Sequence, residues 1–330
     1  MERMNYGESQ IYDIQPIQSA GSGSLTPALS QSIGPELFQS WLSYLDAKPK
    51  TIQTYTRNIK QFMLWLASKG ISRPDRQDIR AFRDEMAADH KPNTVQAYMA
   101  AVKQFFNWTE EAGVYPNIAK GVQLIEKAES SEHLHGYLTS KQAKRLLDAV
   151  DRTTLKGKRD YAMLALMMTT GLRTISVSLA LVEDLRTAGD SAALYYQGKG
   201  HSQKDTFVKL SEPVEAAIRD YLAARGRVSG SDPLFASTAN RNAGKAMTTR
   251  SISGICKTWL KRAGFDSETL TAHSMRHTAA TLNLRAGGTV EETQQLLNHK
   301  NIATTMIYSH VIDREQSQSE ERISGLIFGC

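Results

Sequence analysis

The side chains that could do chemistry in this sequence are cationic or hydroxyl groups in the second half of the chain. Arg173 follows the apolar run YAMLALMMTTGL, where a charged group needs a partner or a bound anion. A salt bridge to Glu183 or Asp184 is the structural alternative. Lys199 lies between two glycines in GKGHSQKD, where the backbone can approach a ligand closely. The rest of a P-loop is missing there, and a lysine that is simply solvated would fit the same pattern.

A third segment, AHSMRHTAATLNL, presents three basic side chains at helical spacing. His273 shares a helix face with Arg276 and with His277. Two histidines four residues apart could bind zinc, but the glutamate of the zinc-protease motif is absent and the segment contains no other zinc ligand. His273 and Arg276 better suit an anion held by the forked guanidinium, with the imidazole placed for proton transfer.

The fourth segment, LLNHKNIATTMIYSH, contains a tyrosine between two histidines. The preceding helical run ends at Asn298, a residue that tolerates the left-handed conformation common at helix C-termini, so His299 is expected just beyond the helix. Tyr308 taken alone would be a core tyrosine. Taken with the other segments, it is a candidate nucleophile. His277 is interpreted as structural, and His310 as structural or as a group that supports the site residues without touching the substrate.

The order of these residues resembles the tyrosine recombinase family, the phage-integrase type. The matching strings are TGLRT, GKGHSQKDTFVKL, HSMRHTAAT and LNHKNIATTMIYSHV. The resemblance extends over about residues 34–312 and is most specific over 138–312. It implies a site that needs no cofactor and no metal ion. The implied catalytic residues are Arg173, Lys199, His273, Arg276, His299 and Tyr308.

The residue types suit the reaction that this family performs. The permanently charged guanidinium groups of Arg173 and Arg276 can clamp the non-bridging oxygens of a DNA phosphodiester and stabilise its transition state. The phenol of Tyr308, with an ordinary pKa of about 10, needs a base, for which His273 is the candidate. The resemblance implies that the product is a 3′-phosphotyrosine with a released 5′-hydroxyl.

The resemblance also implies that Lys199 protonates the leaving 5′-oxygen and that His299 donates a hydrogen bond to the phosphate. Two positions depart from the family pattern. Ser176 occupies the place of an acidic residue that usually buttresses the first arginine, so Arg173 is expected to be held differently or less firmly. Asn298 replaces a glycine, and this change is predicted to be tolerated because asparagine also adopts the left-handed conformation.

A mostly helical domain must position these residues. Thr139 with Gln142 three positions later has the pattern of a capping box, and a long apolar helix is expected through RDYAMLALMMTTGL. The segment ALYYQGKGHSQKDTFVKLS contains two β-rich runs around a turn, which predicts a hairpin. Further helices are predicted over 212–225, 248–263, 274–286 and 289–297. The catalytic domain is assigned to residues 138–312. The tail 313–330, with its apolar ISGLIF, is expected to dock on a neighbouring protomer.

A helical module precedes this domain. Apolar residues recur on one face of TIQTYTRNIKQFMLWLASKG and of PNTVQAYMAAVKQFFNWTEEAG, with shorter helices near 35–46 and 76–88. Residues 34–126 are therefore predicted to form a four-helix domain, which the resemblance implies to be a SAM-like core-binding domain. Residues 1–33 are predicted to be disordered, and 127–137 to be a linker. The predicted fold class is mainly α with a small β-sheet (α+β).

Composition limits the class of protein. The 330 residues are 41% hydrophobic, no apolar run is long enough to span a bilayer, and the first ten residues show no secretion signal. Cys256 and Cys330 offer neither a disulfide framework nor a zinc spacing. The whole chain has a net charge of +6. Because residues 1–34 and residues 313–330 each carry −2, residues 35–312 carry +10. That excess, with a pI near 9.1, favours a polyanionic partner.

The resemblance implies double-stranded DNA with specific core sites as the substrate, and a homotetramer that holds two duplexes and forms a Holliday junction. It allows an accessory directionality factor and implies a cytoplasmic, nucleoid-associated protein of a bacterium or phage. A mobile-element integrase is favoured, with resolution of chromosome or plasmid dimers as the alternative. Two other classes share features of the pattern. A type IB topoisomerase uses similar chemistry without site preference, and a non-catalytic DNA-binding protein would lack the site.

Overall fold

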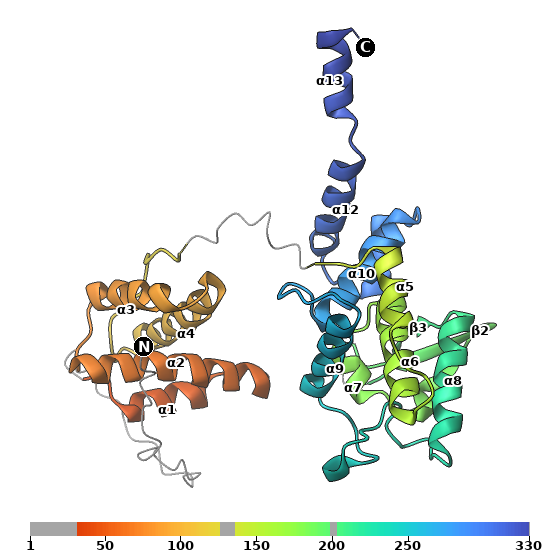
Figure 1. The fold of residues 1–330 in the computed structure, drawn as a ribbon. Coiled ribbons are helices and arrows are strands. Elements are labelled where there is room, and N and C mark those ends of the chain that lie inside the picture. Colours follow the sequence, from red (N-terminus) through yellow and green to blue (C-terminus); the bar gives the residue numbers. More distant parts are fainter. Residues whose placement is uncertain (1–31, 126–135, 199–202, 330) are drawn as a thin grey trace. The chain divides into compact units, whose positions relative to one another are not determined.

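The computed structural model describes residues 32–125, 136–198 and 203–329 (Figure 1). The chain divides into two compact units, Met1–Ser130 and Ser131–Cys330. Most of the predicted disordered lead-in and linker, together with Lys199, lies outside the described residues. The predicted fold class, mainly α with a small sheet, is confirmed.

The first unit contains the four helices that the apolar periodicity predicts. They are α1 (Pro35–Tyr44), α2 (Pro49–Lys69), α3 (Arg76–Asp89) and α4 (Pro92–Glu111). Three of them have proline in the first turn, where the missing N–H costs nothing. α2 ends at Gly70, whose φ of 67° is the left-handed conformation of a helix cap. The helices enclose an aromatic core made by Trp41, Phe62, Phe82, Phe105 and Phe106.

The second unit contains the remaining elements. They are α5 (Ser140–Asp148), α6 (Leu155–Thr170), α7 (Thr174–Leu179), η2 (Val182–Asp184), β1 (Leu185–Ala188), β2 (Ser191–Tyr196), β3 (Thr206–Lys209), α8 (Glu212–Arg225), η3 (Asn240–Asn242), α9 (Thr249–Arg262), α10 (Ala272–Arg285), α11 (Val290–Leu297), α12 (Ala303–Gln316) and α13 (Ser319–Phe328). The capping box of Thr139 and Gln142 is present at the start of α5. The predicted helices correspond to α5, α6 and α8–α11.

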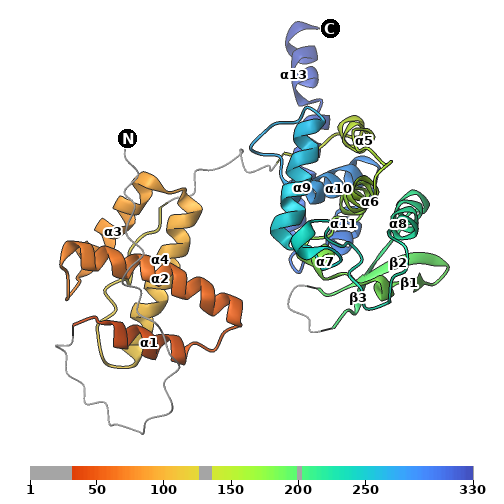
Figure 2. The same ribbon diagram turned by 60° about the horizontal axis from the view of Figure 1, so that its bottom comes forward.

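The central helix of this unit is α6, which packs against α8 and α10 (Figure 2). It is apolar on most of its circumference and buried along most of its length, as expected for a helix with neighbours on several sides. An ion pair lies near its start: Arg159 Nη2 is 2.6 Å from Asp160 Oδ1. The other oxygen of Asp160 accepts a hydrogen bond of 2.9 Å from Trp259 on α9. The buried carboxylate therefore joins α6 to α9.

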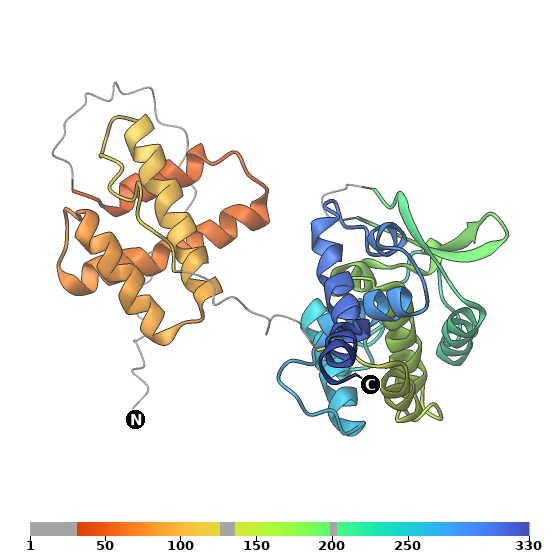
Figure 3. The same ribbon diagram turned by 90° about the horizontal axis from the view of Figure 1, so that it is seen from above.

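The sheet has the order β1-β2-β3 and is antiparallel, with β2 and β3 forming the predicted hairpin. Figure 3 shows the strands at one side of the unit, beside its helices. The segment that leads into β3 is fixed by an ion pair between Lys204 and the buried Asp184. The same carboxylate accepts a hydrogen bond of 2.7 Å from the backbone N–H of Leu181. The hairpin on which Lys199 was predicted to lie is thus tied to the core through the segment that connects β2 to β3.

The last two helices differ in how they are packed. α12 packs on α10 and α11, whereas α13 has no buried residue and lies apart from the other helices of the unit (Figure 1). The first four residues of the predicted tail continue α12. Leu326 and Phe328 of α13 are 88% and 73% exposed. No helix in the described ranges is both long enough and apolar enough to cross a bilayer.

Candidate active site

A glycine at the end of α6 brings the first arginine into place. Gly171 has a φ of +64°, and a Cβ built there would lie 2.4 Å from Cδ2 of Leu297. Glycine fits here because it adopts a positive φ without strain and has no Cβ to collide with Leu297. The chain then turns so that Arg173 becomes the residue before α7. The string TGLRT is therefore a helix end followed by an arginine at a helix start.

Arg276 is buried on α10 and connects three elements. Its Nη1 donates a hydrogen bond of 2.6 Å to the carbonyl of Gly171, and its Nη2 one of 2.5 Å to the carbonyl of Leu297. Burial, and after it the positive charge of Arg173, lower the pKa of Arg276 to about 10. The group still stays charged at neutral pH. The two guanidinium groups are close enough for their positive charges to repel each other, and a concave surface lies beside them. Such a site is suited to binding an anion.

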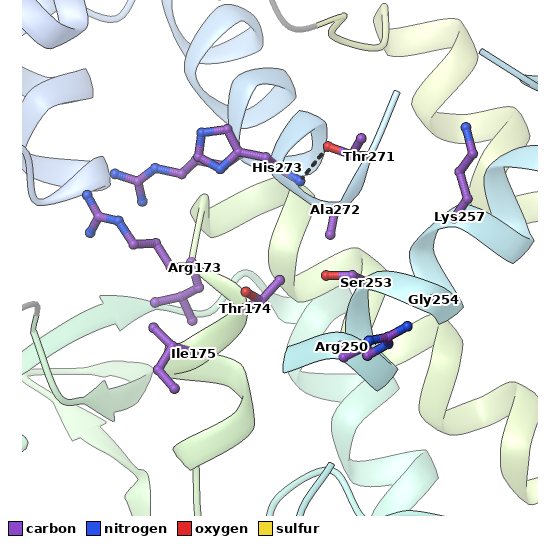
Figure 4. A pocket seen from close by; sticks show the side chains of 12 residues that line it. Arg173, Thr174, Ile175, Arg250, Ser253, Gly254, Lys257, Thr271, Ala272 and His273 are labelled. Atoms are coloured by element: carbon purple, nitrogen blue, oxygen red, sulfur yellow. Dashed lines mark hydrogen bonds between the residues drawn. The ribbon is translucent and has the colours of Figure 1, made fainter. Parts of the chain in front are cut away.

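Arg173, His273 and Arg276 line a pocket of about 690 Å³, and Figure 4 shows the side chains of Arg173 and His273 on the same side of it. The opposite wall comes from α9, through residues that include Arg250 and Lys257. Lys257 donates a hydrogen bond of 2.5 Å to the carbonyl of Ser267. None of the described residues that line the pocket is acidic. This basic wall was not predicted from the sequence, because the types and spacing of Arg250 and Lys257 do not distinguish them from ordinary exposed helix residues.

The predicted salt-bridge alternative for Arg173 is not found. Asp184 pairs with Lys204 and lies 3.9 Å from Arg186, and in the described part of the chain Arg173 has no carboxylate partner. Ser176, which occupies the position of the usual acidic residue, is buried on α7. The guanidinium of Arg173 is therefore available to bind an anionic ligand in the pocket.

His299 lies directly after the helix, as predicted. Asn298 has φ 48° and ψ 54°, and among the described residues it is the only non-glycine with a positive φ. The ring Nδ1 of His299 is 2.8 Å from the hydroxyl of Thr305. Burial lowers the pKa of His299 to about 4, with further contributions from Arg276, Arg173 and His273. The imidazole is neutral at pH 7. When the Thr305 hydroxyl donates to Nδ1, the proton of the His299 ring is on Nε2, and this N–H can donate a hydrogen bond to a phosphate oxygen.

Tyr308 lies on α12, is 4% exposed and packs on Ala280 and Leu297. Its hydroxyl is 2.6 Å from Nδ1 of His277. Burial raises the pKa of Tyr308 to about 12, and the charges of Arg276 and Arg173 oppose that rise. The candidate nucleophile is therefore protonated and held by a histidine that the sequence analysis treated as structural.

The structure brings five of the six predicted residues to one site, and the sixth, Lys199, lies outside the described residues. The ring of His273 lies 4.6 Å from that of His277, edge to face, on the same side of α10. His310 is exposed on α12. In the described residues no three His, Cys, Asp or Glu side chains gather as metal ligands.

Two family models match the chain. The Phage integrase family model covers residues 136–315, and the model of the Phage integrase N-terminal SAM-like domain covers residues 36–114. A tyrosine recombinase XerC of Caldanaerobacter subterraneus is 33% identical over 54% of this chain and 48% of its own length. A tyrosine recombinase XerC of Oceanobacillus iheyensis is 28% identical over 81% of this chain and 87% of its own length. The chain thus spans about half of the first relative and most of the second.

Solved structures share the fold. The XerH site-specific recombinase bound to a palindromic difH substrate, in a post-cleavage complex, has a TM-score of 0.69 at 19% identity, over 88% of this chain and 83% of that one. A λ integrase (75–356) dimer bound to a core site has a TM-score of 0.64 at 17% identity, over 83% and 94%. At these identities the likeness concerns the fold alone. The family model matches more than half of the residues, including the helices and turns that carry the site, and the chain belongs to the phage integrase family of tyrosine recombinases.

Proposed function

We propose that this protein is a site-specific DNA recombinase that cuts and rejoins strands through a 3′-phosphotyrosine. One observation carries the proposal: Arg173, Arg276 and the neutral His299 converge beside the buried hydroxyl of Tyr308. A phosphodiester resists a nucleophile because of its negative charge. Two cations with no carboxylate partner among the described residues, set next to a phenol, remove that obstacle.

The reaction assigns one task to each group. Arg173 and Arg276 bind the non-bridging oxygens, and His299 donates a hydrogen bond to one of them. The Tyr308 oxygen forms a bond to phosphorus while the bond to the 5′-oxygen breaks, and Lys199 supplies the proton that this oxygen takes. Because the phosphotyrosine keeps a phosphodiester bond, a 5′-hydroxyl of a partner strand can reverse the step without ATP. His273 remains a candidate base for the phenol.

Charge supports DNA as the substrate. Residues 35–312 hold a net +10, and Arg250 and Lys257 extend the positive surface from the phosphate pocket along α9. Contacts of this kind bind the backbone of a duplex without reading its sequence. The four-helix unit supplies the second DNA-binding surface. Core recombination sites are the proposed targets, and the protein acts at the nucleoid.

The exposed helix α13 supports an assembly on DNA. Ile323, Leu326, Ile327 and Phe328 expose more than half of their surface, a cluster that a neighbouring protomer would cover. We place it on a second copy in a homotetramer that holds two duplexes, with exchange through a Holliday junction. Deletion of residues 313–330 should abolish the DNA-bound tetramer in size-exclusion chromatography. Unchanged assembly and activity would refute this placement.

Integration or excision of a mobile element is the proposed role, with an accessory directionality factor setting the direction. A recombinase that resolves chromosome or plasmid dimers would use the same site. The genes and repeats that flank the coding sequence distinguish the two roles. Inverted repeats or attachment sites beside the gene support the first, and a single site near the replication terminus supports the second.

A nicked suicide substrate that carries the cognate half-sites tests the chemistry. The cut releases a short fragment, religation is prevented, and a covalent protein–DNA adduct accumulates. The adduct should vanish in Tyr308→Phe, while binding of the half-site remains. An adduct that persists in this variant would show that another residue is the nucleophile. Relaxation of supercoiled DNA without any cognate site would instead indicate a type IB topoisomerase, and DNA binding without an adduct a non-catalytic protein.

A further inference from the structure

We propose that His277, the residue that follows the second arginine, accepts the phenolic proton of Tyr308 during strand cleavage. The inference rests on the proposed function. Its basis is the contact between the reacting atom and an imidazole: Nδ1 of His277 lies 2.6 Å from the Tyr308 hydroxyl. A base must be within hydrogen-bond reach of the proton it removes, and this distance meets that condition.

The contact between Tyr308 and His277 lies in an enclosed part of the structure. Tyr308 and His277 are both buried, and the tyrosine ring is held by Ala280 and Leu297, with Leu284 partly buried beside it. The rings of His277 and Tyr308 lie 5.3 Å apart, at an angle of 52°. In this enclosure the phenol has the imidazole as a direct proton acceptor, and bulk water has little access to the hydroxyl.

The phenol needs such an acceptor. With its pKa raised to about 12, only about one molecule in 10⁵ carries a phenolate at pH 7. The hydroxyl must therefore lose its proton as it attacks. A neutral His277 with its proton on Nε2 presents the lone pair of Nδ1 to the hydroxyl and leaves the oxygen's own lone pairs for phosphorus.

The O–H bond of Tyr308 breaks and its proton passes to Nδ1 of His277, while the Tyr308 oxygen bonds to phosphorus. The phosphorus–O5′ bond breaks, and the 5′-oxygen takes a proton from Lys199. The new imidazolium sits one residue from Arg276, and the phosphate held by that arginine supplies the negative charge that stabilises it. On rejoining, His277 returns the proton to the departing tyrosine.

His273 is the competing base, and its geometry differs. It lies one helical turn before His277 and lines the pocket together with Arg173 and Arg276. That place suits a group that contacts the phosphate. The two histidines are thus assigned separate tasks, His273 at the phosphate and His277 at the nucleophile.

The experiment measures single-turnover adduct formation on the nicked suicide substrate from pH 6 to pH 9. His277→Asn places an amide where Nδ1 was, so it can keep a hydrogen bond but cannot take a proton. Its rate at pH 7 should fall about 10²- to 10⁴-fold, and should still rise at a pH where the wild-type rate has levelled. Half-site binding should not change. His310→Asn, on the exposed face of α12, is the matched control and should behave as wild type.

Chemical rescue separates proton transfer from a structural role. A 3,5-difluorotyrosine at position 308 has a lower phenol pKa and needs a base less. It should restore much of the rate of His277→Asn and little of the rate of His273→Asn. His277→Gln provides a second variant that cannot take a proton, should the asparagine variant fail to fold. The thermal transition of each variant reports its folding.

The outcomes are distinct. If wild type forms the adduct and His277→Asn cleaves at the same rate with the same pH profile, the inference is overturned and the recombinase proposal stands. Rescue of His273→Asn in place of His277→Asn would also overturn it. If wild type forms no adduct at all on cognate half-sites, the proposed function itself fails.

Discussion

Replacing Gly171 by alanine should damage both the stability and the chemistry of this protein. The residue has a φ of +64°, and an L-residue in that conformation costs roughly 1–2 kcal/mol. The added Cβ would also lie 2.4 Å from Cδ2 of Leu297, against an ordinary contact of about 3.5–4.0 Å. Leu297 is buried and its carbonyl is bonded to Arg276, so it cannot simply turn aside.

The magnitude follows from the two costs. Overpacking of this kind adds about 1–3 kcal/mol, which brings the total to about 2–5 kcal/mol. In a unit of about 200 residues this lowers the Tm by about 4–20 °C. Leu297 must also move by about 1 Å, and it precedes His299 and binds Arg276. A shift of that size in a catalytic site costs about 10²-fold in rate.

Gly189→Ala is the matched control, because Gly189 has a φ of +59° in the same unit and nothing lies within 4 Å of its added Cβ. It should lose only the conformational cost. Differential scanning calorimetry gives the Tm of each variant, and the suicide substrate gives the cleavage rate. If Gly171→Ala matches Gly189→Ala in Tm and cleaves at the wild-type rate, the assigned role of this glycine is wrong.

Three further outcomes are expected. Asp160→Ala should lower the free energy of unfolding by about 3–5 kcal/mol, because it leaves a buried arginine unpaired. Asp148→Ala breaks an exposed pair with Lys144 and should leave the free energy of unfolding nearly unchanged; urea denaturation compares the two variants. Because the pKa of His299 is lowered to about 4, the unfolded chain binds more protons than the folded one from about pH 6.5 down to about pH 4. Wild type should therefore lose more stability than His299→Asn over that window, and equal losses would contradict the lowered pKa. Cys256 is buried and its pKa is raised to about 12, so in a Cys330→Ser chain it should react with iodoacetamide only after unfolding, and rapid native labelling would contradict its burial.

Much of the fold could be predicted because periodicity and helix ends are local properties. The left-handed Asn298, the capping box at Thr139 and the hairpin all follow from residue types at short range. α12 was not predicted, since its β-branched start has low helix propensity. Packing on α10 and α11 stabilises it as a helix instead. Strand β1 is only four residues long, too short to give a clear pattern.

The site was predictable as a set of residue types and less so as a set of contacts. Spacing indicated that His273 and Arg276 share a face, but not that Arg276 binds two backbone carbonyls at the ends of other helices. The contact of His277 with Tyr308 joins positions 31 residues apart. It depends on how α12 lies against α10, which no local pattern contains.

The docking of Tyr308 on its own chain has a genetic consequence. The proposed nucleophile Tyr308, the arginine clamp and the proposed proton acceptor His277 lie in one polypeptide, so under the proposed mechanism each copy supplies all of these residues to its own site. Two different inactive alleles, one lacking Tyr308 and one lacking Arg276, should then fail to complement each other in a mixed assembly. If four copies act together, a single dead copy stalls the exchange of its own strand, and such alleles behave as dominant over the wild type.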